Sequence, residues 1–359
     1  VLTNAYSIII LAILIVQGKP LKLPDFASMT LPSPFDISGS SAAKVTPPQN
    51  FIPANRRPLQ VTSLSDLPSL LSGSAALAVR LGSGAFVLGW QPSGGSGYEL
   101  SLGPVSISDS SSVLLPAQDR GLKQPLVLYE YEPSPYCKKV REVCCLLDIP
   151  VLMKPCPITP TPPPEASTRG GSTPYVKKTR GGFSDELFEK TGRRTVPYLE
   201  DPNNPELAGG MFESEDIIDY LLETYSPVGE YDAKALWPMR GPFADTTSTI
   251  STVFRGLAGG TSPPNVLPVN SEVLPITVWG YECSPFVKPV REALSSLGLP
   301  HVLIPCSRGS ENRQKLIERT GCDFQVPQLE DPNLPEFGVL AESSSIVDYL
   351  NAVYTSSNE

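Results

Sequence analysis

The chain carries the stretch LYEYEPSPYC at residues 128–137 and a similar stretch, VWGYECSPFV, at residues 278–287. Each stretch is followed by a basic segment that ends in Arg-Glu, KKVRE in the first case and KPVRE in the second. The two blocks lie 150 residues apart. A repeat of this kind indicates that one structural unit occurs twice in the chain.

Two further blocks recur in the same order. VPYLEDPN at residues 196–203 matches VPQLEDPN at residues 326–333, and FESEDIIDYL at 212–221 matches AESSSIVDYL at 341–350. The offset falls to 130 residues for the first of these pairs, so the first copy holds about 20 extra residues. We expect the Pro-, Thr- and Gly-rich stretch 158–175 to be this insertion and to form a surface loop.

Each copy predicts a strand, a helix and a second strand, then two short strands and a closing helix. In the first copy, residues 127–131 and 151–153 are expected to be strands joined by a right-handed crossover helix. The closing helix is expected to begin with Ser214 as its N-cap. The buried face of the crossover helix is predicted from the i, i+3, i+4, i+7 spacing of Val140, Val143, Cys144 and Leu147.

The pattern predicts an α/β protein of two tandem βαβ-ββα domains, preceded by an irregular, Pro-rich arm with a small β element. The 40 prolines support the extended arm, because proline fixes φ and lacks a backbone donor. A short helix is expected through Leu64, Leu67, Leu70 and Leu71, and strands near 85–88 and 98–102. The expected parts are an apolar N-terminus and arm (1–60), a small irregular and β extension (61–124), domain 1 (125–225), a linker (226–274) and domain 2 (275–354).

Composition narrows the classes of function. The formal net charge is −9, whereas a nucleic-acid-binding domain carries a basic face, so we expect no nucleic-acid partner. The seven cysteines are odd in number, which argues against a secreted disulfide framework. A single histidine excludes a His-rich metal site, and no metal is predicted. Short basic clusters are expected to be solvated faces: Lys138, Lys139 and Arg141; Lys177, Lys178 and Arg180; Arg193 and Arg194.

The N-terminal run 5–16 is almost entirely apolar but shorter than the roughly 20 residues that span a bilayer. Three interpretations stay open: a remnant of a targeting sequence, a buried element of a soluble domain, and an anchor that makes a peripheral membrane contact. The Pro-rich segment that follows is expected either to be disordered or to wrap a protein partner or membrane complex.

The repeated blocks resemble the N-terminal domain of glutathione transferases and the glutaredoxins, both thioredoxin folds. The tandem arrangement resembles plastid thioredoxin-family proteins of plants and algae, which implies a location on the stromal side of a plastid, with a thylakoid association. Glutathione is the cofactor that the resemblance implies.

The resemblance also implies roles for single residues. Val196-Pro197 and Val326-Pro327 match the Val-Pro whose peptide bond is cis and whose backbone edge binds glutathione. Glu213-Ser214 and Glu342-Ser343 match the acidic-serine pair that holds its γ-glutamyl end, at a helix N-terminus that offers donors to a carboxylate.

The redox motif of such proteins is Cys-x-x-Cys, in which the first cysteine attacks and the second resolves the mixed disulfide. Ser134 and Ser284 occupy the attacking position here, Cys137 keeps only the second position, and Val287 replaces it in the other copy. A dithiol oxidoreductase is therefore not expected. Candidates for other chemistry are Ser134 and Ser284, as serines that favour a glutathione thiolate, Cys137, and Cys283 as a monothiol near the helix start.

For the other cysteines and the histidine, a structural role is expected. Cys144 is expected to lie in the core. Cys156 and Cys306 follow the second strand of their copies, where strand-end packing and a shared metal or cluster site are the alternatives. His301 is expected to be exposed or to act as a cap.

Two functions follow. The first is a non-catalytic structural or linker subunit of a larger assembly, such as a photosynthetic membrane complex, because both attacking cysteines are missing. The alternative is a glutathione-binding or thiol-linked protein with weak redox or transferase activity, because the Val-Pro and Glu-Ser pairs are kept.

Overall fold

The structure is a computed structural model. It describes residues 45, 47–48, 51–53, 67–85, 87, 91–92, 99–102, 105–108, 117–159, 182–226, 238–267, 273–320 and 324–356. The apolar run 5–16, most of the predicted arm, and the insertion 158–175 beyond Thr159 lie outside these residues. No helix in the described ranges is long and apolar enough to span a membrane.

The two copies fold alike, and the predicted pair of tandem thioredoxin folds is confirmed. The first copy consists of β4 (Leu126–Glu130), α3 (Pro135–Leu146), β5 (Val151–Pro155), α4 (Phe183–Thr191), β6 (Tyr198–Glu200), β7 (Met211–Phe212) and α5 (Ser214–Tyr225). The second consists of β8 (Ile276–Gly280), α7 (Val287–Ser296), β9 (His301–Pro305), α8 (Glu311–Thr320), β10 (Gln328–Glu330), β11 (Val339–Ala341) and α9 (Ser343–Tyr354). Short 3-10 turns occur at Ala117–Arg120, Pro205–Leu207 and Pro335–Phe337.

Helices α4 and α8 add one element per copy to the βαβ-ββα prediction. Their apolar periodicity is weak: Leu187 is the buried apolar residue of α4 and Leu316 that of α8. A helix that covers a sheet face with one large side chain leaves little signal in the sequence.

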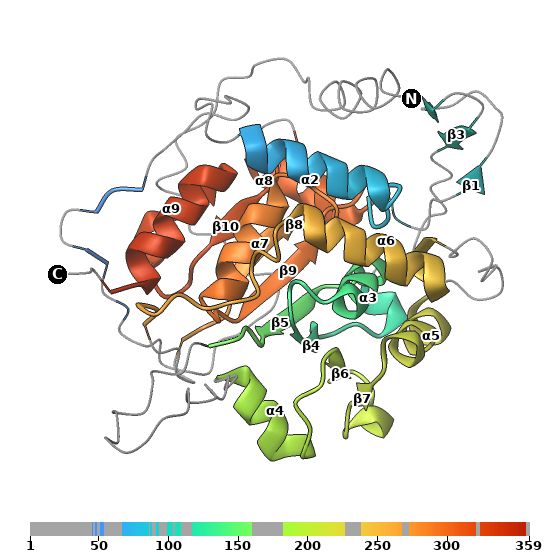
Figure 1. Ribbon diagram of the computed structural model, residues 1–359, viewed down its shortest axis with the longest axis horizontal. Coiled ribbons are helices and arrows are strands. Elements are labelled where there is room, and N and C mark those ends of the chain that lie inside the picture. The colour runs from blue at the N-terminus through green and yellow to red at the C-terminus, as the bar shows by residue number, and fades with distance from the viewer. Residues whose placement is uncertain are drawn as a thin grey trace, which may run out of the picture.

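All the strands of the two copies belong to one sheet, in the order β11-β10-β8-β9-β5-β4-β6-β7 (Figure 1). Within each copy the first two strands are parallel, as the crossover helix requires. Between the copies β5 and β9 pair antiparallel, with Val151 opposite Leu303 and Met153 opposite His301. The two thioredoxin folds are therefore joined edge to edge by backbone hydrogen bonds.

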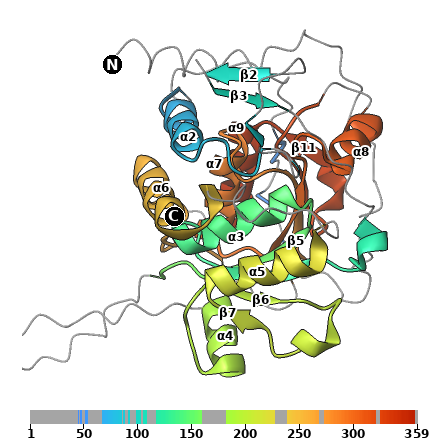
Figure 2. The ribbon, with the colours of Figure 1, turned by 90° about the vertical axis from the view of Figure 1, so that its right-hand side faces the viewer.

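Alternate strand residues pack on opposite faces of this sheet, as the pleat requires. Leu128 and Val278 lie in the main core, which also holds the buried faces of α3, α5, α7 and α9. Their neighbours Tyr129 and Trp279 lie in two smaller clusters, with Leu187 of α4 and Leu316 of α8 respectively. The sheet is thus covered on both faces, and Figure 2 shows α4 lying apart from α3 and α5.

Two further helices, α2 (Leu67–Val79) and α6 (Gly241–Phe254), lie side by side (Figure 1). Helix α2 was expected, whereas α6 lies in the segment predicted as a linker. Both helices bury small residues, which let neighbouring backbones approach closely: Gly73, Ser74 and Ala76 of α2, and Ala244, Ser248 and Ser251 of α6.

The small β element is a separate sheet of β1 (Gln91–Pro92), β2 (Glu99–Leu102) and β3 (Val105–Ser108), in the order β1-β3-β2. Strand β2 matches the expected strand at 98–102. The strand expected at 85–88 is wrong, since Ala85 and Val87 lie outside any strand.

Candidate functional site

The motif serines lie at the start of the first helix of each copy, Ser134 directly before α3 and Ser284 three residues before Val287, the first residue of α7. Ser134 is the N-cap of α3, and its Oγ accepts a hydrogen bond from the Cys137 amide at 3.3 Å. The Oγ of Ser284 accepts one from the Val287 amide at 3.4 Å. Ser134 is 9% exposed and Ser284 is 0% exposed. Both hydroxyls are therefore engaged with the helix start and shielded from solvent.

Both Val-Pro bonds are cis, as predicted, at Val196-Pro197 and Val326-Pro327. Each pair lies just before the third strand of its copy, β6 or β10, and both prolines are buried.

The Glu-Ser pairs start the closing helices, but the predicted capping role of Ser214 is wrong. Glu213 holds the N-cap position with φ of 68°, and Ser214 is the first residue of α5. Glu342 and Ser343 repeat this arrangement at α9, with φ of 76° at Glu342. A positive φ is uncommon for a residue with a side chain. Its occurrence at both matched positions marks these corners as sites held by the surrounding fold.

In the second copy the three motifs are bonded to one another. The Ser343 hydroxyl donates to the Phe286 carbonyl at 2.6 Å, which joins the start of α9 to the Ser-Pro-Phe motif. The Gln325 amide, next to Val326, donates to Glu342 Oε1 at 3.0 Å. Both residues of the Glu-Ser pair are thus engaged within the fold.

In the first copy the motifs meet through neighbouring residues. Lys139 of α3 pairs with Glu215 at 2.6 Å, and the rings of Tyr198 and Phe212 are 4.6 Å apart. Glu213 is exposed, and its carboxylate makes no hydrogen bond to another described residue. The glutamate of the pair is therefore more accessible in the first copy than in the second, whereas Ser214 is buried and Ser343 is half-buried.

The candidate thiols are buried. Burial and the nearby Glu130 carboxylate raise the pKa of Cys137 to about 12. Burial likewise raises the pKa of Cys283, whose S–H donates to the Gly82 carbonyl at 3.9 Å. A thiolate is the reactive form of cysteine, so neither residue is an activated nucleophile at neutral pH.

Two segments outside the repeated blocks cover the motifs, and the repeats in the sequence do not predict either of them. The turn after α2 pairs with the second copy: the Val87 amide donates to the Arg308 carbonyl at 2.8 Å, and the Arg308 amide to the Ala85 carbonyl at 2.7 Å. The turn after α6 pairs with the first copy, where the Ile158 amide donates to the Gly260 carbonyl at 2.8 Å. Ile158 and Arg308 are matched positions, so the two covers are equivalent.

The covers lie very close to the motifs. A side chain at Gly73 would lie 2.9 Å from Cβ of Pro285, and one at Gly260 would lie 2.8 Å from Cγ of Pro133. A weak signal exists in the sequence: each helix is followed by an arginine and a Gly-rich turn, at Arg80–Gly84 and Arg255–Gly260.

The structure also shows where the histidine and the remaining cysteines with a predicted location lie. His301 is fully buried, not exposed, and its Nδ1 lies 3.0 Å from the Leu299 carbonyl. Cys144 is in the core, as predicted. Cys156 and Cys306 lie in separate apolar clusters, because β5 and β9 run antiparallel and their ends point apart. In the described ranges no cluster of His, Cys, Asp and Glu is placed to hold a metal ion.

Comparison with known proteins agrees with this architecture. The family described as "Glutathione S-transferase, N-terminal domain" matches residues 128–229 and 278–357, slightly more than half of the chain. Searches of curated proteins and of solved structures each gave no match. The two matched segments correspond to the two thioredoxin folds of the single sheet. The chain therefore belongs to the glutathione S-transferase N-terminal domain family, and it carries that domain twice.

Proposed function

We propose that the protein is a non-catalytic structural or linker subunit, in which the joined thioredoxin folds form a body that attaches to a larger assembly. One observation carries this proposal. The position from which a thioredoxin-fold enzyme attacks its substrate is serine in both copies, and both serines are buried under segments of the same chain. A buried hydroxyl that already caps a helix is poorly placed to reach a substrate.

A surface on α6 supports the attachment to a partner. Small polar residues of α6 face inward, while its large apolar residues face outward, which is the reverse of an ordinary amphipathic helix. Contiguous apolar side chains on a soluble surface mark interaction sites. The exposed residues, each 40% to 65% exposed, are Phe243, Ile250, Val253 and Phe254 of α6 and Leu257 of the turn that follows it.

The proposal extends to location on the basis of the resemblance described above. We place the protein on the stromal side of a plastid, associated with a photosynthetic membrane complex, with the N-terminal arm and the apolar run 5–16 contributing contacts to protein or membrane. The apolar composition of that run and the missing attacking cysteines are the supporting observations.

Native sizing of gently solubilised membranes tests the proposal. We expect the protein to co-migrate with a large complex at fixed stoichiometry, and to be released by deletion of residues 1–60 or by Val253→Asp. The control is Phe188→Asp, which places the same charge on an exposed apolar residue of α4. A species near 38.6 kDa that never co-migrates would overturn the proposal.

A second candidate function is glutathione binding at the first copy. The accessible Glu213 beside Ser214 and the cis Pro197 fit the γ-glutamyl end and backbone of the peptide, whereas the second copy's Glu342 and Ser343 are already bonded. Calorimetry with reduced glutathione tests this. We expect binding that Glu213→Gln weakens and Glu342→Gln leaves unchanged. No heat at millimolar glutathione, with the protein folded, would exclude it.

A further inference from the structure

The interface between the two copies contains buried charged side chains at matched positions, 150 residues apart. Arg141 and Arg291 lie on the first helices, and each pairs across the interface. The Arg141 Nε donates to Glu282 Oε2 at 2.9 Å, and an Nη of Arg291 donates to Glu132 Oε1 at 2.5 Å. These pairs are nearly inaccessible to solvent, so the charges must balance within the protein.

The covering helices add a second matched layer. Arg80, after α2, donates from its Nε to Glu142 Oε1 at 2.9 Å. Arg255, after α6, donates from its Nε to Glu292 Oε1 at 2.7 Å. Glu142 directly follows Arg141 in the sequence, and Glu292 directly follows Arg291. Both pairs are internally neutral.

One carboxylate has no counterpart. Glu130 accepts from Arg141 in the first copy, but Gly280 occupies the matched position in the second. A side chain at Gly280 is excluded, because its Cβ would lie 2.7 Å from Cγ2 of Val287. The Nε of Arg291 is buried and has no acceptor among the described residues.

With every group ionised, the part of this network that the structure describes contains one positive charge more than its carboxylates offset. Its six cations are Arg80, Lys138, Arg141, Arg255, Lys288 and Arg291, and its five carboxylates are Glu130, Glu132, Glu142, Glu282 and Glu292, all with side chains at most 10% exposed.

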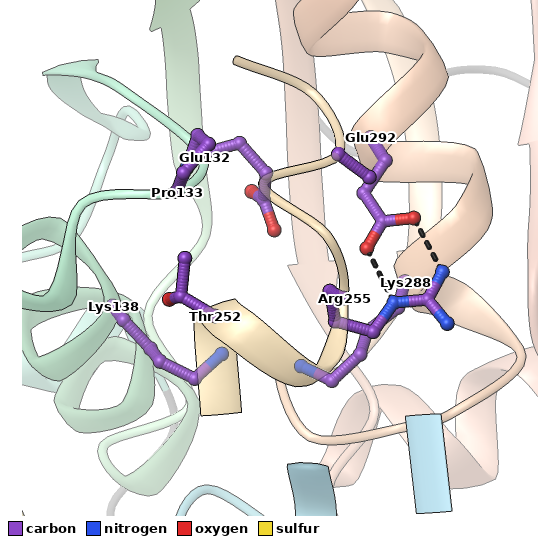
Figure 3. Close-up of a pocket in the computed structure, with 8 residues that line it drawn as sticks. Glu132, Pro133, Lys138, Thr252, Arg255, Lys288 and Glu292 are labelled. Atoms are coloured by element: carbon purple, nitrogen blue, oxygen red, sulfur yellow. Dashed lines mark hydrogen bonds and ion pairs between the residues drawn. The ribbon is translucent and has the colours of Figure 1, made fainter. Parts of the chain in front are cut away.

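Two cations of the network, Lys138 and Lys288, lie at a small pocket. Lys138 and Lys288 reach towards the same carboxylate oxygen, Glu282 Oε1, at 3.0 and 3.7 Å, and both line a pocket beside Thr252 (Figure 3). Each ammonium has three N–H donors. Lys288 also donates to the Glu282 carbonyl at 3.2 Å, and both ammonium groups have donors left for further acceptors. The carboxylates that also line the pocket are already bound, Glu132 by Arg291 and Glu292 by Arg255. The space suits about one water-sized particle.

We propose that a small monovalent inorganic anion, with chloride as the abundant example, binds between Lys138 and Lys288 and neutralises the interface between the two copies. The anion supplies the negative charge that a carboxylate at position 280 would supply if the second copy had one. The ammonium groups supply its donors, and Thr252 of α6 and Ala258 of the turn after α6 also line the pocket. Burial and the neighbouring Lys138 lower the pKa of Lys288 to about 7, and a bound anion would favour the charged form of this ammonium.

Thermal unfolding of the full chain in sodium chloride and in sodium gluconate at equal ionic strength tests the proposal. Gluconate is too large for the pocket. We expect chloride to raise the unfolding midpoint by about 1–3 °C more than gluconate, with saturation, as ligand linkage requires. Lys138→Met and Lys288→Met should abolish this difference. Lys139→Met is the matched control, because Lys139 is equally buried on the same helix but pairs with Glu215 and Asp245.

Bromide provides a second measurement on the unaltered protein, in case the lysine variants do not fold. A crystal soaked in sodium bromide should give an anomalous peak between the two ammonium groups. Absence of the peak would overturn the proposal, as would equal midpoints in chloride and gluconate. A chloride effect that persists in Lys138→Met, or that is lost in Lys139→Met, would also overturn it.

Discussion

Glu282 is the residue whose loss should most weaken the contact between the two copies. Its carboxylate contacts Arg141 at 2.9 Å, Lys138 at 3.0 Å and Lys288 at 3.7 Å, and it also pairs with Arg291. Glu282→Gln keeps the shape of the side chain but leaves these cations without its charge. Breaking a buried ion pair from one side costs about 3–5 kcal/mol, and the free energy of unfolding should fall by that amount at neutral pH.

The pH dependence of this loss follows from the pKa of Glu282. Burial opposes ionisation, but Arg141 and Arg291 outweigh it and hold the pKa of Glu282 well below its usual range. A depressed carboxyl pKa stabilises the fold above the pKa of the unfolded chain, about 4.3, and this stabilisation is lost as the pH falls through the folded pKa. The difference between the wild type and the variant should therefore be full at pH 7 and shrink below about pH 4.

Urea unfolding followed by circular dichroism measures this difference. Glu186→Gln is the control, because Glu186 pairs with Lys154 at 2.7 Å on a partly exposed surface, where ion pairs contribute less than about 1 kcal/mol. A loss of less than about 1 kcal/mol in Glu282→Gln, indistinguishable from the control, would refute the view that the charge network holds the copies together.

Three further predictions rest on other buried groups. Burial lowers the pKa of His301 to about 4, so the wild type should lose about 3 kcal/mol between pH 7 and 4 that His301→Gln does not lose; equal pH profiles for both proteins would contradict this. Ellman's reagent should modify at most Cys322 in the native protein and all seven thiols in guanidinium, since the six described cysteines are buried; a second reactive native thiol would be inconsistent. Gly73→Ala should destabilise the protein by about 1–3 kcal/mol through the contact with Pro285, whereas Gly209→Ala, which meets open space, should be nearly neutral; equal effects would argue against tight packing of α2.

The sequence predicts the two thioredoxin folds because their signals are local and occur twice. The apolar spacing of the first helix corresponds to residues that are fully or nearly fully buried, including Val140 and Leu147. The matched Val-Pro and Glu-Ser blocks fix the order of the later elements. Agreement between repeated motifs and periodicity is what makes a fold predictable from one chain.

The interface could not be predicted in the same way. Lys138, Lys139 and Arg141 were expected to be solvated, and this is wrong, because all three are buried. Their partners include Glu282, which is distant in sequence, so the segment itself resembles an exposed basic helix face. Arg193 and Arg194, by contrast, are exposed as expected, and the third cluster, at 177–180, lies outside the described residues.

The pairing of β5 with β9 was equally hidden, since an edge strand that pairs with a second copy has the same pattern as one that meets solvent. The cover after α6 depends on Gly259 and Gly260, because a side chain at either position would collide with residues of the first copy such as Glu132 and Pro133. Signals of this kind become visible only when the two copies are placed together.

The reciprocal pairs Arg141–Glu282 and Arg291–Glu132 have the form of the contacts in a symmetric homodimer, where each contact occurs twice. Here the two halves share one chain, so dilution does not separate them, and their effective concentration is set by the connecting segment. In a homodimer, every substitution in the gene would also change both subunits at the same position. In the fused chain one half can keep Glu130 and Cys137 while the other holds Gly280 and Val287, and the joined sheet can be asymmetric at its centre.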